Sequence, residues 1–143
     1  HIFNIVKKKK CKKFLIPDGD IYGAISTSIK KFNIDIYVGI GGAPEGVLAA
    51  SALKCLGGQM QCRLVFDNNE QKKRATKMGV KNLKKKYQIN DLVKKDSIFA
   101  ATGVTNGYLL NGVKKKRNIF TTHSLIISTK TKNLVFKKNK FKK

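Results

Sequence analysis

A glycine-rich turn at residues 41–46, GGAPEG, is the strongest candidate for chemistry in this sequence. Gly41 and Gly42 have no side chains, so a ligand can approach the backbone there, and the free N–H groups of a following helix attract anions such as phosphate. A carboxylate in the same turn is unfavourable beside a phosphate unless a cation lies between them. The pattern therefore predicts Glu45 as a ligand of a divalent metal. One alternative stays open: Glu45 only complements the dipole of the helix start.

A second acidic turn, Asp18-Gly19-Asp20, precedes this one in the chain. Its carboxylates suit sugar hydroxyls or a metal, although Asp-Gly dipeptides are also ordinary turn formers. A dinucleotide-binding turn is a poorer interpretation of the glycines. Residues 39–41 begin a GxGxxG pattern, but Pro44 occupies the position of its third glycine and no acid ends a strand at the required distance.

Two units of strand, turn and helix position these candidates. The first is a short apolar strand at 14–16 followed by a helix from Ile21 to about Ile29, with Asp18 or Asp20 as its N-cap. The second is a β-branched and aromatic strand at 34–40, followed by an alanine-rich helix that Gly57 and Gly58 end. Glycine-rich turns after strand ends are where layered α/β sheets bind ligands.

The rest of the chain continues the alternation of strands and helices, without a repeat or a linker that divides it. We therefore predict a single α/β layered domain over residues 1–143. The expected later elements are a strand at 61–66, a polar helix at 68–78, a strand at 97–101, an antiparallel pair at 120–128 and 134–136, and a frayed end from residue 137.

The net charge of +23 suggests a nucleic-acid partner at first sight. However, only three of the 31 basic residues are arginine, and lysine, asparagine and isoleucine all have codons rich in A and T. Drift in base composition explains the charge without a partner. The lysine runs at 7–10, 84–86 and 114–116 lie in separate segments without interleaved aromatic residues, so nucleic acid is not expected. A basic nucleic-acid-binding module remains the alternative function.

No apolar run approaches the roughly 20 residues that cross a bilayer, and the first residues do not form a signal peptide. We expect a cytoplasmic chain that needs no membrane. Cys11, Cys55 and Cys62 match no metal or redox spacing, which predicts reduced structural thiols. His123 falls in a strand and is expected to pack or hydrogen-bond. The first residue is His1, not Met, which indicates a processed or incomplete piece.

Four blocks of sequence, in this order, resemble one known family: IPDGD, GIGGAPEGVLAASALKCLGGQMQCRL, IFAATGVTNGYLL and TTHSLII. Together they are similar to the C-terminal half of class II fructose-1,6-bisphosphatases of the GlpX type, from about residue 1 to residue 127. The resemblance implies the layered fold of the lithium-sensitive sugar phosphatases. It also implies hydrolysis of the 1-phosphate of fructose 1,6-bisphosphate, and in some lineages of sedoheptulose 1,7-bisphosphate, with Mn²⁺ or Mg²⁺ as cofactor.

Transferred position by position, the resemblance makes Glu45 a metal ligand and Gly42 a substrate contact. It also makes Asp18, Gly19 and Asp20 contacts to the sugar bisphosphate. The expected partners are this substrate, the N-terminal half that supplies the other metal-binding carboxylates, and further copies of the chain in a homo-oligomer.

The resemblance also shows what is missing from this chain. The N-terminal half has no counterpart in these 143 residues, and of a basic run that touches substrate in the family only His1 is present. One carboxylate holds a divalent metal weakly, so we predict no turnover by this chain alone. A degenerate, non-catalytic homologue of the phosphatases is the other alternative.

Overall fold

A computed structural model describes residues 2–142 of the chain, and the side chains from Ile5 onwards. His1, which the resemblance links to the substrate, lies outside the described residues. The elements in chain order are α1 (Ile2–Lys8), α2 (Asp20–Ser26), the 3₁₀ turn η1 (Lys30–Phe32), α3 (Ala43–Leu56), β1 (Gln61–Arg63), α4 (Asn69–Lys77), β2 (Lys86–Gln88), α5 (Ile89–Leu92), β3 (Ile98–Thr102), β4 (Lys114–Lys116), β5 (Ile119–Ser128) and β6 (Val135–Lys142).

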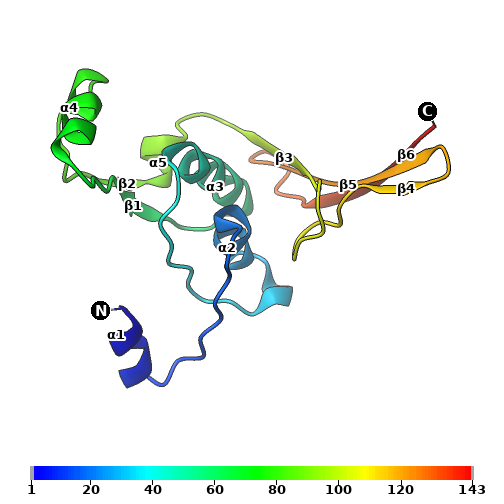
Figure 1. Ribbon diagram of the computed structural model, residues 1–143, viewed down its shortest axis with the longest axis horizontal. Coiled ribbons are helices and arrows are strands. Elements are labelled where there is room, and N and C mark those ends of the chain that lie inside the picture. The colour runs from blue at the N-terminus through cyan, green and yellow to red at the C-terminus, as the bar shows by residue number, and fades with distance from the viewer. Residues whose placement is uncertain (1, 143) are drawn as a thin grey trace.

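The molecule is an open arrangement of helices and antiparallel sheets (Figure 1). Helices α2 and α3 lie at the centre, a four-stranded sheet extends to one side, and the β1/β2 pair with α4 extends to the other. Helix α1 lies apart from this body, near the N-terminus. The predicted mixed α/β class is confirmed. Within residues 2–142, every helix is too short or too polar to cross a membrane.

Helix α3 follows the sequence prediction closely. Pro44 stands in its first turn, where the missing N–H costs no hydrogen bond. Gly57 ends it in the left-handed conformation at φ 74°, and the N–H of Gly58 donates to the carbonyl of Leu53 at 2.8 Å. Its buried positions are mostly alanine, so other elements approach its backbone closely. The buried residues of α3 are Ala49, Ala50, Ala52, Leu53 and Cys55.

The four-stranded sheet is built around the long strand β5. β3 and β4 pair along one edge of β5, and β6 pairs along the other, all antiparallel. The predicted strand at 97–101 and the predicted antiparallel pair are confirmed. The predicted frayed end is wrong, because β6 continues to Lys142, opposite Ile119. Lysine does not interrupt this ladder, since its backbone N–H and carbonyl pair like those of any other residue.

The core lies where α2 and α3 cover one face of this sheet. Ile25 of α2, Ala52 and Cys55 of α3, and Leu125 and Ile127 of β5 share one buried cluster with Phe99. The opposite face of the sheet is open to solvent: Ile98 is 71% exposed and Ile126 is 45% exposed. The fold therefore has two layers, with helices on one side only.

Three local predictions near the candidate site are wrong. Residues 14–16 and 34–40 are extended but are not strands, because no strand among residues 2–142 pairs with them. The N-cap of α2 is neither Asp18 nor Asp20. It is Gly19, in the left-handed conformation at φ 95°, without a side-chain hydrogen bond to the helix.

Replacing a core residue of β5 tests this two-layer packing. Leu125→Ala is expected to lower the free energy of unfolding by roughly 2–5 kcal/mol, because it leaves a cavity beneath α3. The adjacent change Ile126→Ala, on the open face, is expected to cost about 1 kcal/mol or less. Urea unfolding of the two variants, followed by circular dichroism, measures both values. Equal losses would contradict the assignment of the buried face.

Candidate functional site

The glycine turn leads directly into α3, as the sequence predicts. Gly42 has an extended backbone at φ −65° and ψ 149°, and it is the N-cap of the helix. Its N–H donates to Oε2 of Glu45 at 2.8 Å. Glu45 therefore does stabilise the start of the helix, as the alternative interpretation proposed. Its side chain is nevertheless exposed, and Oε1 has no hydrogen-bond partner among residues 2–142.

The acidic turn leads into α2. Asp18 is exposed, and its Oδ1 accepts a hydrogen bond from the N–H of Gly19 at 2.7 Å. Gly19 adopts φ 95°, a conformation in which a side chain would be strained. This bend places Asp20 in the first turn of the helix, half-buried, with its carboxylate toward the glycine turn.

Tyr37 connects the two turns, and sequence reasoning missed it. Its hydroxyl donates a hydrogen bond to Oδ1 of Asp20 across 17 residues of chain. Its ring lies so close to Gly23 of α2 and to Gly39 that a Cβ atom at either position would overlap it. The only signal in the sequence was a tyrosine that alternates with glycines along 37–41. From the sequence alone, this tyrosine is an ordinary aromatic residue of the predicted strand at 34–40.

Asp20 and Glu45 converge on Gly41. A Cβ atom built on Gly41 would lie 3.2 Å from Oε2 of Glu45 and would overlap Oδ2 of Asp20. The two carboxylates therefore lie on neighbouring sides of a residue that has no side chain. No contact in the described part of the chain brings Asp18 to this point. The structure thus joins two of the predicted site residues around Gly41, while Asp18 and Gly19 lie one step away on the bend.

The charges of the two acids are visible in the titration of Tyr37. The pKa of Tyr37 is raised to about 12, first by burial, then by the hydrogen bond to Asp20, and then by the charges of Asp20 and Glu45. A phenolate here would face two carboxylates. The potential at this point is therefore negative, although the chain as a whole is strongly basic.

This pair is a partial match to a site for Mg²⁺ or Mn²⁺. Both cations prefer oxygen ligands, and two carboxylates beside a glycine backbone supply such ligands. No group of three or more His, Cys, Asp or Glu side chains able to hold a metal occurs in residues 2–142. Asp20 and Glu45 thus provide the start of a coordination shell that needs further ligands.

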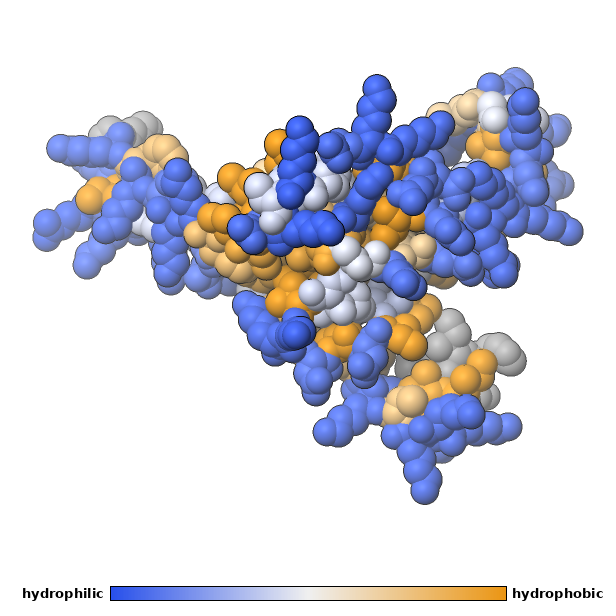
Figure 2. Space-filling view, turned by 180° about the vertical axis from the view of Figure 1, so that it is seen from behind, coloured by the Kyte–Doolittle hydropathy of each residue, from blue (hydrophilic) through white to orange (hydrophobic). Residues whose placement is uncertain are grey.

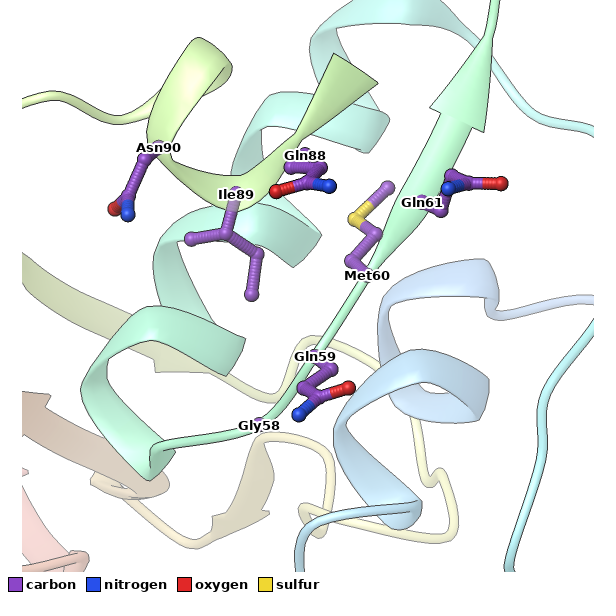
Figure 3. Close-up of a pocket in the computed structure, with 7 residues that line it drawn as sticks. All are labelled: Gly58, Gln59, Met60, Gln61, Gln88, Ile89 and Asn90. Atoms are coloured by element: carbon purple, nitrogen blue, oxygen red, sulfur yellow. The ribbon is translucent and has the colours of Figure 1, made fainter. Parts of the chain in front are cut away.

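A pocket of about 510 Å³ lies elsewhere, beside the end of α3 (Figure 3). It is lined by Gly58, Gln59, Met60, Gln61, Gln88, Ile89 and Asn90. None of these side chains is charged, so the pocket offers a phosphate neither a cationic side chain nor a carboxylate that could hold a metal. It contains none of the predicted site residues.

The remaining sequence candidates have structural roles. Nδ1 of His123 accepts a hydrogen bond from the N–H of Asn111 at 3.0 Å, which confirms its predicted role. All three cysteines are free thiols, and Cys55 is buried with its sulfur 3.4 Å from the carbonyl oxygen of Ser97.

The fold gathers lysines that are separate in the sequence. β4 and β6 flank β5, so the paired positions Lys114 and Lys140 lie on either side of Thr121, and Lys116 and Lys142 on either side of Ile119. We call five lysines on this face of the sheet the sheet-tip lysines: Lys114, Lys116, Lys138, Lys140 and Lys142. Figure 2 shows this end of the molecule covered by hydrophilic side chains. Residues 97–143 contain no Asp or Glu.

Comparison with known proteins confirms the resemblance. The family described as bacterial fructose-1,6-bisphosphatase, glpX-encoded, matches residues 1–140. The chain is 39% identical over 137 residues to the class 2 fructose-1,6-bisphosphatase of Haemophilus influenzae, covering 86% of this chain and 41% of the relative. It is 38% identical over 135 residues to fructose-1,6-bisphosphatase 1 class 2 of Escherichia coli K12, covering 85% of this chain and 40% of the relative.

The matched part is the C-terminal part of these relatives, and the chain spans about two fifths of their length. By this match over nearly its whole length, the chain belongs to the bacterial, glpX-encoded fructose-1,6-bisphosphatases.

Proposed function

We propose that this chain supplies part of the active site of a metal-dependent phosphatase that removes the 1-phosphate of fructose 1,6-bisphosphate. The observation that carries the proposal is the convergence of Asp20 and Glu45 on Gly41, at the start of α3, in a member of this family. Sedoheptulose 1,7-bisphosphate is a second possible substrate of the same chemistry. The layered lithium-sensitive phosphatase fold and self-association in a homo-oligomer belong to this proposal.

In the proposed site, Asp20 and Glu45 hold a divalent cation, Mn²⁺ or Mg²⁺. Such a cation supplies a Lewis acid beside the phosphoryl oxygens and compensates their charge. Tyr37 positions Asp20 through its hydroxyl, which keeps one carboxylate oxygen directed toward Gly41. Glu45 is positioned by its bond to the Gly42 N–H, which leaves its second oxygen available.

The start of α3 receives the phosphate in this proposal. The N–H groups of Ala43 and Glu45 have no hydrogen-bond acceptor among residues 2–142, and they lie in the first turn of a 14-residue helix. Such groups stabilise negative charge on a phosphoryl oxygen. Gly42 leaves space for the ligand. Asp18 accepts hydrogen bonds from the sugar hydroxyls on the adjacent bend, where the backbone of Gly19 and Asp20 also contacts the sugar.

The proposal requires a second part of the enzyme. Two carboxylates hold Mg²⁺ or Mn²⁺ weakly, and a phosphatase must also orient its nucleophile and leaving group. The relatives are longer than this chain by a region that precedes the matched part. We propose that this N-terminal region carries the remaining metal ligands.

A second candidate function rests on the sheet-tip lysines. Their rows cross β4, β5 and β6 over roughly 10 Å, two strand spacings, with no acid in the same part of the chain. On the opposite face Lys115 lies over the Phe120 ring at 5.5 Å, and Phe120 is paired with the exposed Phe141. Single-stranded nucleic acids bind cations and stack on aromatic rings. Here the five lysines and the aromatic rings lie on opposite faces of the same end of the sheet, with Lys115 on the face of the rings. The fold therefore brings the run at 114–116 beside the lysines of β6, while the runs at 7–10 and 84–86 stay in other parts of the molecule.

The phosphatase proposal predicts that activity depends on Glu45 and on the N-terminal region. The chain alone is expected to release no phosphate from fructose 1,6-bisphosphate with Mn²⁺. Joined to the N-terminal region of the Haemophilus influenzae relative, it is expected to do so, and Glu45→Gln is expected to lower kcat/KM roughly 100-fold or more. Glu70→Gln, at the first turn of α4, is the matched control. An active Glu45→Gln variant removes Glu45 from the site, and an inactive fusion indicates a degenerate homologue.

The electrostatic arrangement predicts a specific titration of Tyr37. The difference in absorbance between the native chain and Tyr37→Phe is expected to titrate near 12. Asp20→Asn is expected to lower this pKa toward 10, because it removes a charge and weakens the acceptor, whereas Asp18→Asn is expected to leave it unchanged. The raised pKa favours the neutral phenol in the folded state, so this contribution to stability is present below pH 10 and is lost between pH 10 and about 12. An effect of Asp18→Asn equal to that of Asp20→Asn would contradict the geometry.

A polyanion-binding sheet predicts a steep dependence of RNA affinity on salt. Five phosphate contacts give a slope of about −3.5 in log K against log salt for a single strand, measured by fluorescence anisotropy. Lys138→Gln with Lys140→Gln is expected to reduce the magnitude of this slope by about 1.4. The control, Lys72→Gln with Lys73→Gln on α4, removes the same charge from another surface. A shallow slope that both double variants change equally would contradict RNA binding at this sheet. The high net charge would then be explained by drift in base composition.

A further inference from the structure

The segment at residues 34–40 has the composition of a strand but no strand partner. Its sequence is IDIYVGI, and its residues are neither helix nor strand in the structure. No backbone group of residues 2–142 and no side chain of residues 5–142 hydrogen-bonds to the backbone N–H or carbonyl groups of residues 34–41. Both edges of the segment are therefore unpaired, at a place where β-branched residues favour pairing.

The apolar side chains of the segment fall into two environments. Tyr37 is directed into the body of the protein, where it packs against the cluster of Ala24, Ala49 and Leu53. Ile36 is 78% exposed, Val38 is 61% exposed and Ile40 is 83% exposed. These three aliphatic side chains, which we call the apolar row, are therefore left largely uncovered by the described chain.

Such an arrangement is costly for a protein in water. A row of large aliphatic side chains loses the free energy of burial, and an open strand edge is a template for another chain. Strands that read as continuous apolar runs are those buried on both faces inside a sheet. Apart from Asp35 and Gly39, the segment has the composition of an inner strand, although in this chain Tyr37 packs against the body and neither edge is paired.

We infer that residues 34–40 are the docking strand for the N-terminal region that precedes the matched part in the relatives, pairing with strands of that region along its edges. The inference rests on the proposed function in naming that region as the partner. Two observations favour this occupant over a second copy of the chain. The relatives exceed this chain by more than half of their own length. The segment also runs directly into the turn of Gly41 and Glu45, where further metal ligands are required.

Docking at this strand would also fix the backbone that carries the candidate site. A ladder along residues 34–40 holds the backbone on both sides of Tyr37, and so holds the bond from Tyr37 to Asp20 and the turn that follows. Ligands carried by the added strands would then reach the Gly41 turn from the same edge. Docking of the N-terminal region would therefore order the site and bury the apolar row at the same time.

Hydrogen–deuterium exchange tests the inference without using catalysis. The probe is the N-terminal region of the Haemophilus influenzae relative, fused ahead of this full chain and compared with the chain alone. Amides 35–41 are expected to exchange rapidly in the chain alone and at least about 100-fold more slowly in the fusion, because ladder hydrogen bonds protect them. The amides of α3 report whether the chain is folded in both.

The outcomes separate docking from activity. Slow exchange of amides 35–41 in the chain alone would overturn the inference, since it requires them to be unpaired there. Rapid exchange in the fusion would overturn it too, whether or not α3 is protected, since the added region would then not complete the fold through this strand. Protection of the segment in an inactive fusion would support the docking strand while contradicting the proposed function. Dependence of protection in the chain alone on its concentration would favour a second copy instead.

Paired variants test the apolar row. Ile36→Lys with Ile40→Lys is expected to leave the stability of the chain alone unchanged and to remove at least about 10-fold of the protection of amides 35–41 in the fusion. Met78→Lys is the control, because Met78 is 79% exposed at the end of α4, away from the segment. Equal protection in the double variant and the control would show that the row is not buried by the added region.

Discussion

The close packing of α3 on both of its sides is the constraint on which the rest of the structure depends. Its buried positions are alanine, leucine and cysteine, so α2 approaches one side and the sheet of β3 and β5 approaches another. Cys55 lies within hydrogen-bonding distance of Ser97, just before β3, and Nζ of Lys54 donates to the carbonyl of Val93 at 2.5 Å. The helix is therefore held at its C-terminal end by the sheet and by the segment that leads into β3. Its N-terminal end, with the glycine turn, is left open.

Two acidic side chains lie at that open end, although the chain as a whole is strongly basic. Asp20 and Glu45 face one glycine in a protein of net charge +23, and the basic residues lie on the outer strands and helices instead. Two acids brought together without a cation repel each other, so their proximity has a cost unless a ligand uses it. Tyr37 and the Gly42 N–H hold the two carboxylates in place. Positioned acids of this kind are typical of sites rather than of ordinary surfaces.

The same end of the molecule carries its unpaired backbone. The segment at 34–40 runs directly into the glycine turn and presents apolar side chains to solvent. The proposed site and the unpaired segment therefore lie beside each other in the chain. In layered α/β proteins the ligand-binding turns follow strand ends, so a strand formed by residues 34–40 would end at the proposed site.

Sequence alone determined the elements whose signals are local. Helix α3 was predicted from Pro44 and the C-terminal glycines, and the β5 and β6 pair from alternating residues. The place of Glu45 in the first turn of α3 followed from the same local signals, whereas its role as a metal ligand stays a prediction. Only the tertiary structure decided what depends on neighbours. It brought Tyr37 to Asp20, and Asp20 to Gly41, across a distance in the chain that no periodicity encodes. It placed β6 beside β5 although its residues are mostly charged, and it left 34–40 unpaired although they are mostly apolar. A helix satisfies its hydrogen bonds within its own sequence, whereas a strand and a site are completed by residues from elsewhere, which is why the second kind of feature was the one that sequence could not decide.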